Sequence, residues 1–294
     1  MRDSDFTGCR VGFFGAGRVA RALAPALAAA GQLVTFVASR SAESAVELAA
    51  TLPGCRALPL AEALAAPPPA DVYLLTLPDA AVAAVLAAAA WPAGAVVAHL
   101  AGALPLAVVR ENAPGVRGGA FYPLQTFSPG RLIDWPTVPV FIEATDAETE
   151  ARLLALAASL GGRPSRLASA QRLRLHLAAV WASNFTNHLL GVADALLAEA
   201  GLPLALLHPL VRETVAKALA ADPSPFAVQT GPAQRRDTAT LTAHEAALAA
   251  HPAWRALYAG LSASIQAASE NAGSRNPGSE NPGSENPEGS SKLK

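Results

Sequence analysis

The chain has 294 residues, which is enough for one large domain or for two of ordinary size. Hydrophobic residues make up 52% of it and charged residues only 15%, below the roughly 25% that is typical of soluble domains. With a net charge of -1 and no cluster of lysine or arginine, the sequence lacks the electrostatic footprint of a nucleic-acid-binding protein. We therefore expect no nucleic-acid partner.

Cysteine usage and the apolar stretches indicate a cytoplasmic protein without a membrane partner. Cys9 and Cys55 have neither the number of a disulfide framework nor the spacing of a metal site, so we expect no bound metal. The N-terminal residues lack the apolar core of a signal peptide. Residues 80–109 carry no charge and are long enough to span a bilayer, but Pro92 and Gly94 interrupt the run.

Strands and helices alternate over the first half of the chain. This alternation is typical of a parallel sheet covered by helices on both faces. It predicts an α/β, Rossmann-like NAD(P)-binding domain over residues 8–166. The expected strands lie at 9–15, 32–39, 56–58, 71–77, 95–100, 116–122 and 138–144, with helices between them that include 18–31, 41–54 and 146–162.

Helical periodicity replaces this alternation after about residue 168. Segments 169–201, 204–221 and 238–269 predict an all-α domain over residues 167–269, which we expect to shape a substrate cleft and to form a homodimer. From Glu270 the chain becomes a repeat rich in Pro, Gly, Ser and Asn, which cannot pack a core. Residues 270–294 are therefore predicted to be a disordered tail.

The turn after the first strand carries a dinucleotide-binding motif. Gly15, Gly17 and Ala20 match G-x-G-x-x-A, where the glycines permit a tight turn and a close approach to a pyrophosphate, and the alanine permits close packing. The helix N-terminus then faces the anion. Small residues also serve plain turns, but the place of this motif in the first βαβ unit favours a cofactor. The predicted contacts are Gly15, Ala16, Gly17, Arg18 and Val19.

The end of the second strand indicates which cofactor binds. An NAD site places an acid there for the ribose 2′-hydroxyl, whereas an arginine accommodates the 2′-phosphate of NADP. The chain reads Ser39-Arg40-Ser41 and has no acid until Glu43. We therefore expect NADP, with NADPH preferred over NADH, although Arg40 could also be a solvated residue at a helix start. Leu77 and Pro78, in the turn after the strand at 71–77, are expected beside the nicotinamide ribose.

Two further residues are candidate substrate ligands. His99 follows a strand at the carboxyl edge of the sheet, where open α/β sheets bind ligands, but a hydrogen-bonded loop histidine is an equally good reading. Arg235, in "TGPAQRRDTATLTAH", could hold a substrate carboxylate, although surface arginines commonly bind nothing specific. In the same segment Asp237 is expected to cap the helix that follows.

The helical stretch "WASNFTNHLL" at 181–190 carries short amides where an exposed helix usually carries charge. A helical wheel places His176, Ser183, Asn184 and Asn187 within about a 100° arc. A solvated polar face is one reading of this arc. The other, which we favour, is the wall of a partly enclosed cleft, because buried amides need a partner and a bound ligand would supply one.

Four segments resemble one family when they follow an N-terminal GxGxxA. They are "GAFYPLQTFSPG", "VFIEA", "LHLAAVWASNFTNHLL" and "TGPAQRRDTATLTAH". The chain is similar, from Val11 to about Ile265, to bacterial Rossmann-like proteins with a C-terminal domain of unknown function 2520, which are commonly labelled NADP oxidoreductases. The label implies a class of chemistry and no substrate.

The resemblance implies a fold like that of 6-phosphogluconate dehydrogenase and ketopantoate reductase, in which a helical domain that often builds a dimer follows the nucleotide domain. Relatives of the hydroxyacid dehydrogenase type place a lysine on the first long helix of the second domain, with an asparagine one turn later. Here His176 is the nearest equivalent of the lysine and Val180 occupies the place of the asparagine. A standard hydroxyacid dehydrogenase mechanism is therefore not expected.

These observations predict an NADPH-dependent oxidoreductase that transfers a hydride to a small carbonyl or imine substrate. His176 is the first candidate for the proton donor, with Tyr122 or His188 as substitutes, and Asn184 and Asn187 would orient the substrate. The alternative is a non-catalytic NADP-binding redox sensor or assembly protein. Amine-forming chemistry like that of pyrroline-carboxylate reductases differs from the first hypothesis only in its substrate.

Overall fold

The computed structural model describes residues 7–274. The chain forms two compact units that divide between Asn187 and His188. The first unit therefore contains the beginning of the helical region that the sequence assigned to a domain starting at 167. Each unit is described by itself.

An eight-stranded sheet forms the centre of the first unit, with the strand order β3-β2-β1-β4-β5-β6-β7-β8. All neighbouring strands are parallel except β6 and β7, which are antiparallel. The strands are β1 (Arg10–Phe14), β2 (Leu33–Ser39), β3 (Arg56–Pro59), β4 (Val72–Leu75), β5 (Val96–His99), β6 (Arg117–Pro123), β7 (Val140–Ala144) and β8 (Ser165–Arg166).

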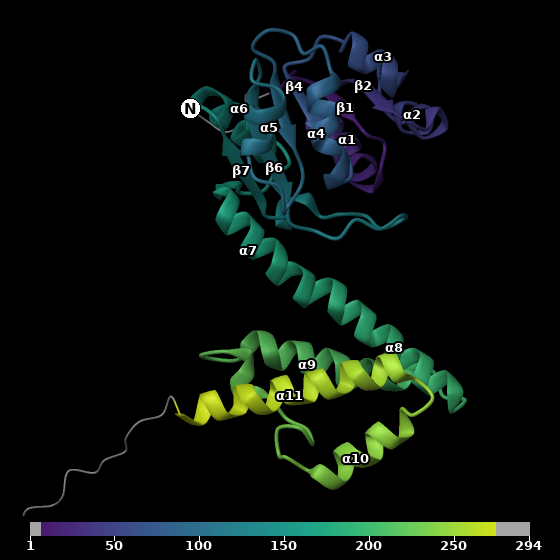
Figure 1. Ribbon diagram of the computed structural model, residues 1–294. Coiled ribbons are helices and arrows are strands. Elements are labelled where there is room, and N and C mark those ends of the chain that lie inside the picture. The colour runs from purple at the N-terminus through teal and green to yellow at the C-terminus, as the bar shows by residue number, and fades with distance from the viewer. Residues whose placement is uncertain (1–6, 275–294) are drawn as a thin grey trace, which may run out of the picture. The chain divides into compact units, whose positions relative to one another are not determined.

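Helices cover both faces of this sheet (Figure 1). Buried side chains from α1 (Arg18–Ala29), α2 (Ala42–Ala49) and α6 (Ala147–Ala158) pack on one face. Those from α3 (Leu60–Ala65), α4 (Asp79–Ala88) and α5 (Ala107–Asn112) pack on the other. Because strand side chains alternate between faces, Phe13 joins the first core and Phe14 the second. The predicted α/β, Rossmann-like architecture is confirmed.

The first unit also contains η1 (Trp135–Thr137), between β6 and β7, and towards its end come α7 (Ser169–Ala179) and a π-helix, η2, over Val180–Phe185. A π-helix bonds each residue to the fifth one along, so its turns are wider than those of an α-helix. The wheel that placed His176, Asn184 and Asn187 on one arc assumed an uninterrupted α-helix and does not hold across this segment.

The second unit is helical in the part that the structure describes. Ala233 and Leu248 are its buried hydrophobic residues there. Asp237 caps α10 as expected, since its carboxylate accepts a hydrogen bond from the Thr240 backbone N–H at 3.0 Å. The helices are α8 (Thr186–Glu199), which begins just before the division, and η3 (Leu204–Leu207), α9 (His208–Ala220), η4 (Pro225–Val228), α10 (Thr238–Ala247) and α11 (Pro252–Ser274).

Helix α11 continues to Ser274, so the first five residues of the predicted tail are helical. The rest of that tail lies outside the described residues. None of the helices in residues 7–274 combines the length and the apolar character that crossing a bilayer requires.

Candidate functional site

The G-x-G turn borders two cavities in the first unit, both at the carboxyl ends of β1 and β4. The small cavity has a volume of about 220 Å³ and the large cavity one of about 470 Å³. They share Gly17, Thr76, Leu77 and Pro78, so the same turn and loop line both. An elongated ligand could therefore contact both cavities at once, as expected for a ligand at this edge of an open α/β sheet.

Gly15 is required by the tight turn itself. Its φ of +113° lies in the region that favours glycine, and a Cβ atom there would come within 2.3 Å of the Thr76 carbonyl oxygen. The Thr76 hydroxyl in turn donates a hydrogen bond to the Gly15 carbonyl oxygen at 2.9 Å. At Gly17 a Cβ would meet nothing closer than 4.0 Å, so the backbone there is open to a ligand.

The small cavity has the composition of a site for a phosphorylated ribose. Ser39 and Arg40, at the end of β2, line it together with Ser44 and Leu60. The Arg40 side chain is exposed and forms no ion pair within the described part of the chain. Ser41 lines neither cavity, because its hydroxyl caps α2 by accepting a hydrogen bond from the Ser44 backbone N–H at 3.2 Å.

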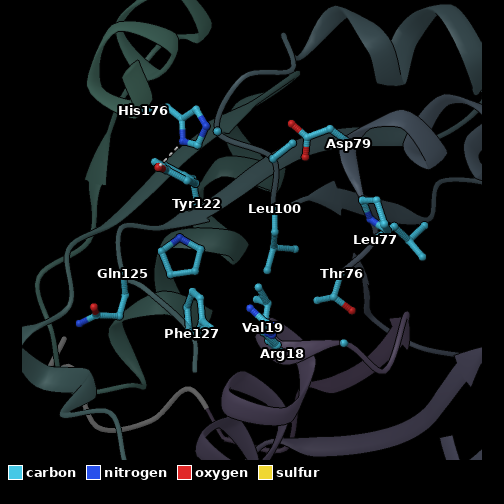
Figure 2. A pocket seen from close by; sticks show the side chains of 15 residues that line it. Arg18, Val19, Thr76, Leu77, Asp79, Leu100, Tyr122, Gln125, Phe127 and His176 are labelled. Carbon is cyan, nitrogen blue, oxygen red and sulfur yellow. Dashed lines mark hydrogen bonds between the residues drawn. The ribbon is translucent and has the colours of Figure 1, made fainter. Parts of the chain in front are cut away.

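The large cavity draws its walls from four loops and from α7, and Figure 2 shows these side chains around it. One end adjoins the start of α1. The other end has Tyr122 from β6 and His176 from α7. The lining residues are Gly17, Arg18, Val19, Thr76, Leu77, Pro78, Asp79, Leu100, Ala101, Gly102, Tyr122, Pro123, Gln125, Phe127 and His176.

Tyr122 and His176 form a hydrogen-bonded pair in the cavity wall. The Tyr122 hydroxyl lies 3.0 Å from Nδ1 of His176, and the two rings meet edge to face at 76°. Burial raises the pKa of Tyr122, and the Asp79 carboxylate adds to this effect, whereas Arg172 acts in the opposite direction. The phenol is therefore protonated at neutral pH and can donate.

Gly102 makes room for the His176 ring. A Cβ atom at this position would lie 2.5 Å from Nδ1 and 2.6 Å from Cγ of the imidazole. No side chain can occupy that space without moving the ring. The imidazole can therefore take this position because residue 102, in the loop that follows β5, has no side chain.

An ion pair anchors the start of α7 one turn before His176. Arg172 is 1% exposed and its Nη1 lies 2.5 Å from Oε2 of Glu143 on β7. Its Nη2 donates to the Leu104 carbonyl oxygen at 2.6 Å, and the Ser169 hydroxyl donates to Glu143 at 2.7 Å. These bonds tie α7 to the sheet and to the loop that carries Gly102.

His99 is completely buried and lines neither cavity. Its Nδ1 accepts a hydrogen bond from the Ala101 backbone N–H at 3.3 Å, and its Nε2 has no partner among the described residues. Burial lowers the pKa of His99 to about 4, and the nearby charge of Arg172 adds to this. His99, which the sequence offered as a substrate ligand, is thus a buried neutral imidazole at the end of β5 that lines neither cavity.

The structure brings together most of the predicted cofactor residues, with His176 and Tyr122 beside them. Asn184 and Asn187 are exposed and line neither cavity of the first unit, so their predicted role in orienting the substrate stays a prediction. His188 and Arg235 belong to the second unit and are exposed. Their roles remain predictions.

Several lining residues were not singled out from the sequence. Thr76 and Asp79 flank the predicted Leu77 and Pro78, so the same turn in the sequence could have indicated them. Gln125 and Phe127 lie in the quoted segment "GAFYPLQTFSPG" without a pattern that marks them. Arg172 lines neither cavity but anchors α7, and it precedes His176 by four residues, a spacing that places both on one helical face. Within residues 7–274, His, Cys, Asp and Glu form no cluster of three that could hold a metal ion.

Two family models match the chain. Residues 10–102 match the model described as NADP oxidoreductase coenzyme F420-dependent, and residues 138–265 match the domain of unknown function DUF2520. No curated protein matches the chain.

Solved structures match nearly the whole chain. A protein from Bacteroides fragilis, provisionally named an NADP oxidoreductase, is 38% identical, with a TM-score of 0.80 over 88% of this chain and 98% of that one. A reductive aminase from Aspergillus terreus, in complex with NADPH and ethyl-5-oxohexanoate, is 21% identical, with a TM-score of 0.62 over 92% and 95%. A pyrroline-5-carboxylate reductase from Coxiella burnetii is 15% identical, with a TM-score of 0.52 over 90% and 98%. The last two likenesses concern the fold.

Proposed function

This chain belongs to the family of NADP oxidoreductases with a C-terminal DUF2520 domain, and on that premise we propose that it is an NADPH-dependent reductase of a small carbonyl or imine substrate. One observation carries the proposal: a hydrogen-bonded tyrosine–histidine pair lines a cavity that shares its wall with the dinucleotide-binding turn. A reductase needs a cofactor and a proton donor side by side, and the first unit holds candidates for both.

The turn and the two loops beside it would hold NADPH. The backbone at Gly15 and Gly17 and the start of α1 suit a pyrophosphate, since Gly17 leaves its backbone open and the helix N-terminus attracts an anion. Thr76, Leu77 and Pro78 line both cavities and would contact the nicotinamide ribose. Bound NADPH would supply the hydride for the reduction.

A preference for NADPH over NADH is proposed from Arg40. Its guanidinium has no ion-pair partner among the described residues and lines the small cavity with two serine hydroxyls, a set of donors that suits a phosphate. Arg40→Ala is expected to weaken NADPH binding about tenfold and to leave NADH binding nearly unchanged, because one charge-assisted contact is worth about 1.5–3 kcal/mol. Equal binding of both cofactors by the unaltered protein contradicts the proposal.

The Tyr122–His176 pair would supply the proton. The phenol stays protonated at neutral pH, and the imidazole can accept its proton at Nδ1 while donating another from Nε2. Together they would deliver a proton to the oxygen or nitrogen that gains electrons when the hydride arrives. Both side chains line the large cavity, which supports this role.

The test is NADPH oxidation over a panel of oxo acids, aldehydes and cyclic imines. His176→Ala and Tyr122→Phe should each lower kcat by about 100-fold or more, as expected for the loss of a general acid, with unchanged NADPH binding. Glu111→Gln changes an exposed residue that lines neither cavity and serves as the control, whereas Asn184→Ala tests the predicted role of Asn184 in orienting the substrate. Full activity in His176→Ala and Tyr122→Phe contradicts the assignment, and tight NADPH binding without turnover of any compound favours the non-catalytic sensor.

A homodimer in the cytoplasm completes the proposal. The helical unit leaves large apolar side chains exposed, among them Leu210 on α9, Leu219 at its end and Phe226 on η4, and a second copy of the chain would cover them. Both cysteines are free thiols, which suits a reducing compartment. A small molecule remains the expected partner in the cavity.

A further inference from the structure

Two formally charged side chains, Arg18 and Asp79, line the large cavity at different places. Arg18 lies at the first position of α1, beside the turn that would hold the pyrophosphate, so a bound phosphate would neutralise it. Asp79 lies at the first position of α4, after the Thr76-Leu77-Pro78 turn. Apart from the titratable His176 and Tyr122, these are the charged residues in the cavity wall. With NADPH bound, the Asp79 carboxylate is therefore the charge left for a substrate to meet.

The Asp79 carboxylate has no partner within residues 7–274: it accepts no hydrogen bond and forms no ion pair there. An acidic residue in the first turn often accepts a hydrogen bond from a backbone N–H group of its own helix. In α4 no side chain caps the N-terminus, and the Asp79 carboxylate accepts no hydrogen bond from the backbone N–H groups of the helix. The side chain is exposed and lines the large cavity. Apart from the helix dipole and the electrostatic effect on Tyr122, no interaction among residues 7–274 engages this carboxylate.

The carboxylate is turned toward the Tyr122–His176 end of the cavity. Figure 2 shows its two oxygen atoms on the side of Asp79 that faces His176. Its charge also acts on Tyr122, where it contributes to raising the pKa of the phenol. A ligand that contacts the tyrosine–histidine pair therefore lies within the electrostatic influence of Asp79.

Resting on the proposed reductase function, we propose that Asp79 selects substrates in which the reacting carbon is double-bonded to a positively charged nitrogen, that is, iminium ions. The unpaired carboxylate attracts such a cation, is indifferent to a neutral ketone and repels the carboxylate of an oxo acid. Gln125 and the Tyr122 hydroxyl offer neutral hydrogen bonds beside it and add no competing positive charge.

The reduction balances with these groups in place. A hydride from NADPH adds to the iminium carbon, and the π-electron pair of the C=N bond moves to nitrogen as a lone pair. The nitrogen thereby loses its positive charge, and NADPH becomes NADP⁺. A proton from the Tyr122–His176 pair then converts the amine to an ammonium ion, which can pair with Asp79 again.

The first experiment measures binding without turnover. Full-length protein saturated with NADP⁺ is titrated with pyrrolidine, which is a cation at neutral pH, and with cyclopentanol, a neutral ring of similar size. Asp79→Asn should weaken pyrrolidinium binding about two- to fivefold and leave cyclopentanol binding unchanged, because one exposed ion pair is lost. Glu111→Gln removes an exposed carboxylate that lines neither cavity and should change nothing.

The second experiment measures NADPH oxidation with N-methyl-1-pyrrolinium and with cyclopentanone. The iminium should be the better substrate of the unaltered protein, and Asp79→Asn should lower kcat/KM for it about two- to fivefold while sparing the ketone. Equal pyrrolidinium binding by both proteins overturns the role of Asp79, and so does a variant that loses NADPH binding instead. Turnover of the ketone alone also overturns it but leaves the reductase function standing. Asp79-dependent binding without any turnover upholds the cation site and contradicts the reductase.

Discussion

At the scale of single residues, the position of His176 depends on a missing side chain. The imidazole occupies the space that a Cβ at Gly102 would fill, and its Nδ1 lies 3.0 Å from the Tyr122 hydroxyl. Gly102→Ala must displace the ring and break this hydrogen bond. Because small misplacements of a catalytic group cost as much as about 100-fold in rate, we expect kcat to fall about 10- to 100-fold at unchanged NADPH affinity. Steady-state kinetics and a cofactor titration measure the two effects.

Gly115→Ala provides the control for this substitution. A Cβ at Gly115 would meet no heavy atom within 4 Å, so the loss of a glycine there should leave kcat unchanged. If Gly102→Ala were as active as Gly115→Ala, the imidazole would not need its present position.

His99 gives the first unit a pH-dependent stability. Burial and the charge of Arg172 lower its pKa in the folded state to about 4, below the 6.5 of a free histidine. The unfolded chain therefore takes up a proton before the folded chain does, so stability falls as the pH drops from 6.5 to about 4. The full shift corresponds to about 3 kcal/mol of unfolding free energy. Hydrogen exchange of β1, β4 and β5 as a function of pH measures it.

His99→Gln keeps a polar side chain but cannot titrate. In this variant the unfolding free energy should therefore no longer change with pH between about pH 5 and 6.5. Glu143 does not interfere in that window. Burial acts to raise the pKa of Glu143, but hydrogen bonds from Ser169 and Arg172 outweigh it, so the net pKa is low and its stabilisation is lost only in more acidic solution. An unchanged slope in His99→Gln would mean that other groups produce it.

At the scale of elements, the buried ion pair holds α7 on the sheet. Arg172→Met leaves Glu143 with one of its two side-chain donors, and breaking such a pair costs about 3 kcal/mol of unfolding free energy. Arg166→Met, which removes an exposed pair with Glu150, should cost less than about 1 kcal/mol. Urea unfolding of both variants distinguishes the two cases. Glu143→Gln added to Arg172→Met should cost little more, whereas additive losses would show that the two side chains act independently.

The sequence predicted the elements of the first unit well because its signals there are local. Apolar runs alternate with helical periods, and the expected strand at 138–144 corresponds to β7 (Val140–Ala144). The direction of that strand is not a local property. A parallel return needs a crossover element, and the segment from Leu124 to Pro139 holds only the three-residue η1, so β7 returns antiparallel to β6. The α/β class could be predicted, but this reversal could not.

The candidate site divides in the same way. The cofactor contacts in the turn from Gly15 to Val19 and at the end of β2 could be predicted, because each set consists of consecutive residues that form a recognisable motif. His176 could be named from its helix, but its partner Tyr122 is 54 residues away and the geometry of the pair is set by tertiary packing. The π-helix at Val180–Phe185 has no signal in the helical period, so the wheel that included Asn184 failed there.

At the scale of the whole molecule, the helical unit is short of buried apolar surface. Helices α8 and α9 contain no buried residue, although both carry several leucines and valines. Full burial of one such side chain contributes about 1.5–3 kcal/mol, so a surface of this kind is costly to leave in water. We propose that a second copy of the chain covers these side chains. This proposal does not depend on the reaction proposed for the first unit.

This association predicts a particle of twice the chain mass of 29.9 kDa in sedimentation equilibrium. Leu219 and Phe226 are 84% and 65% exposed in the helical unit, and changing both to aspartate would place charges in the apolar interface. The double variant should therefore sediment as a monomer at micromolar concentration and unfold at a lower temperature. Leu132→Asp, in a fully exposed loop position of the first unit, should remain a dimer. A monomeric unaltered protein, or a double variant that stays dimeric, would exclude the helical unit as the interface.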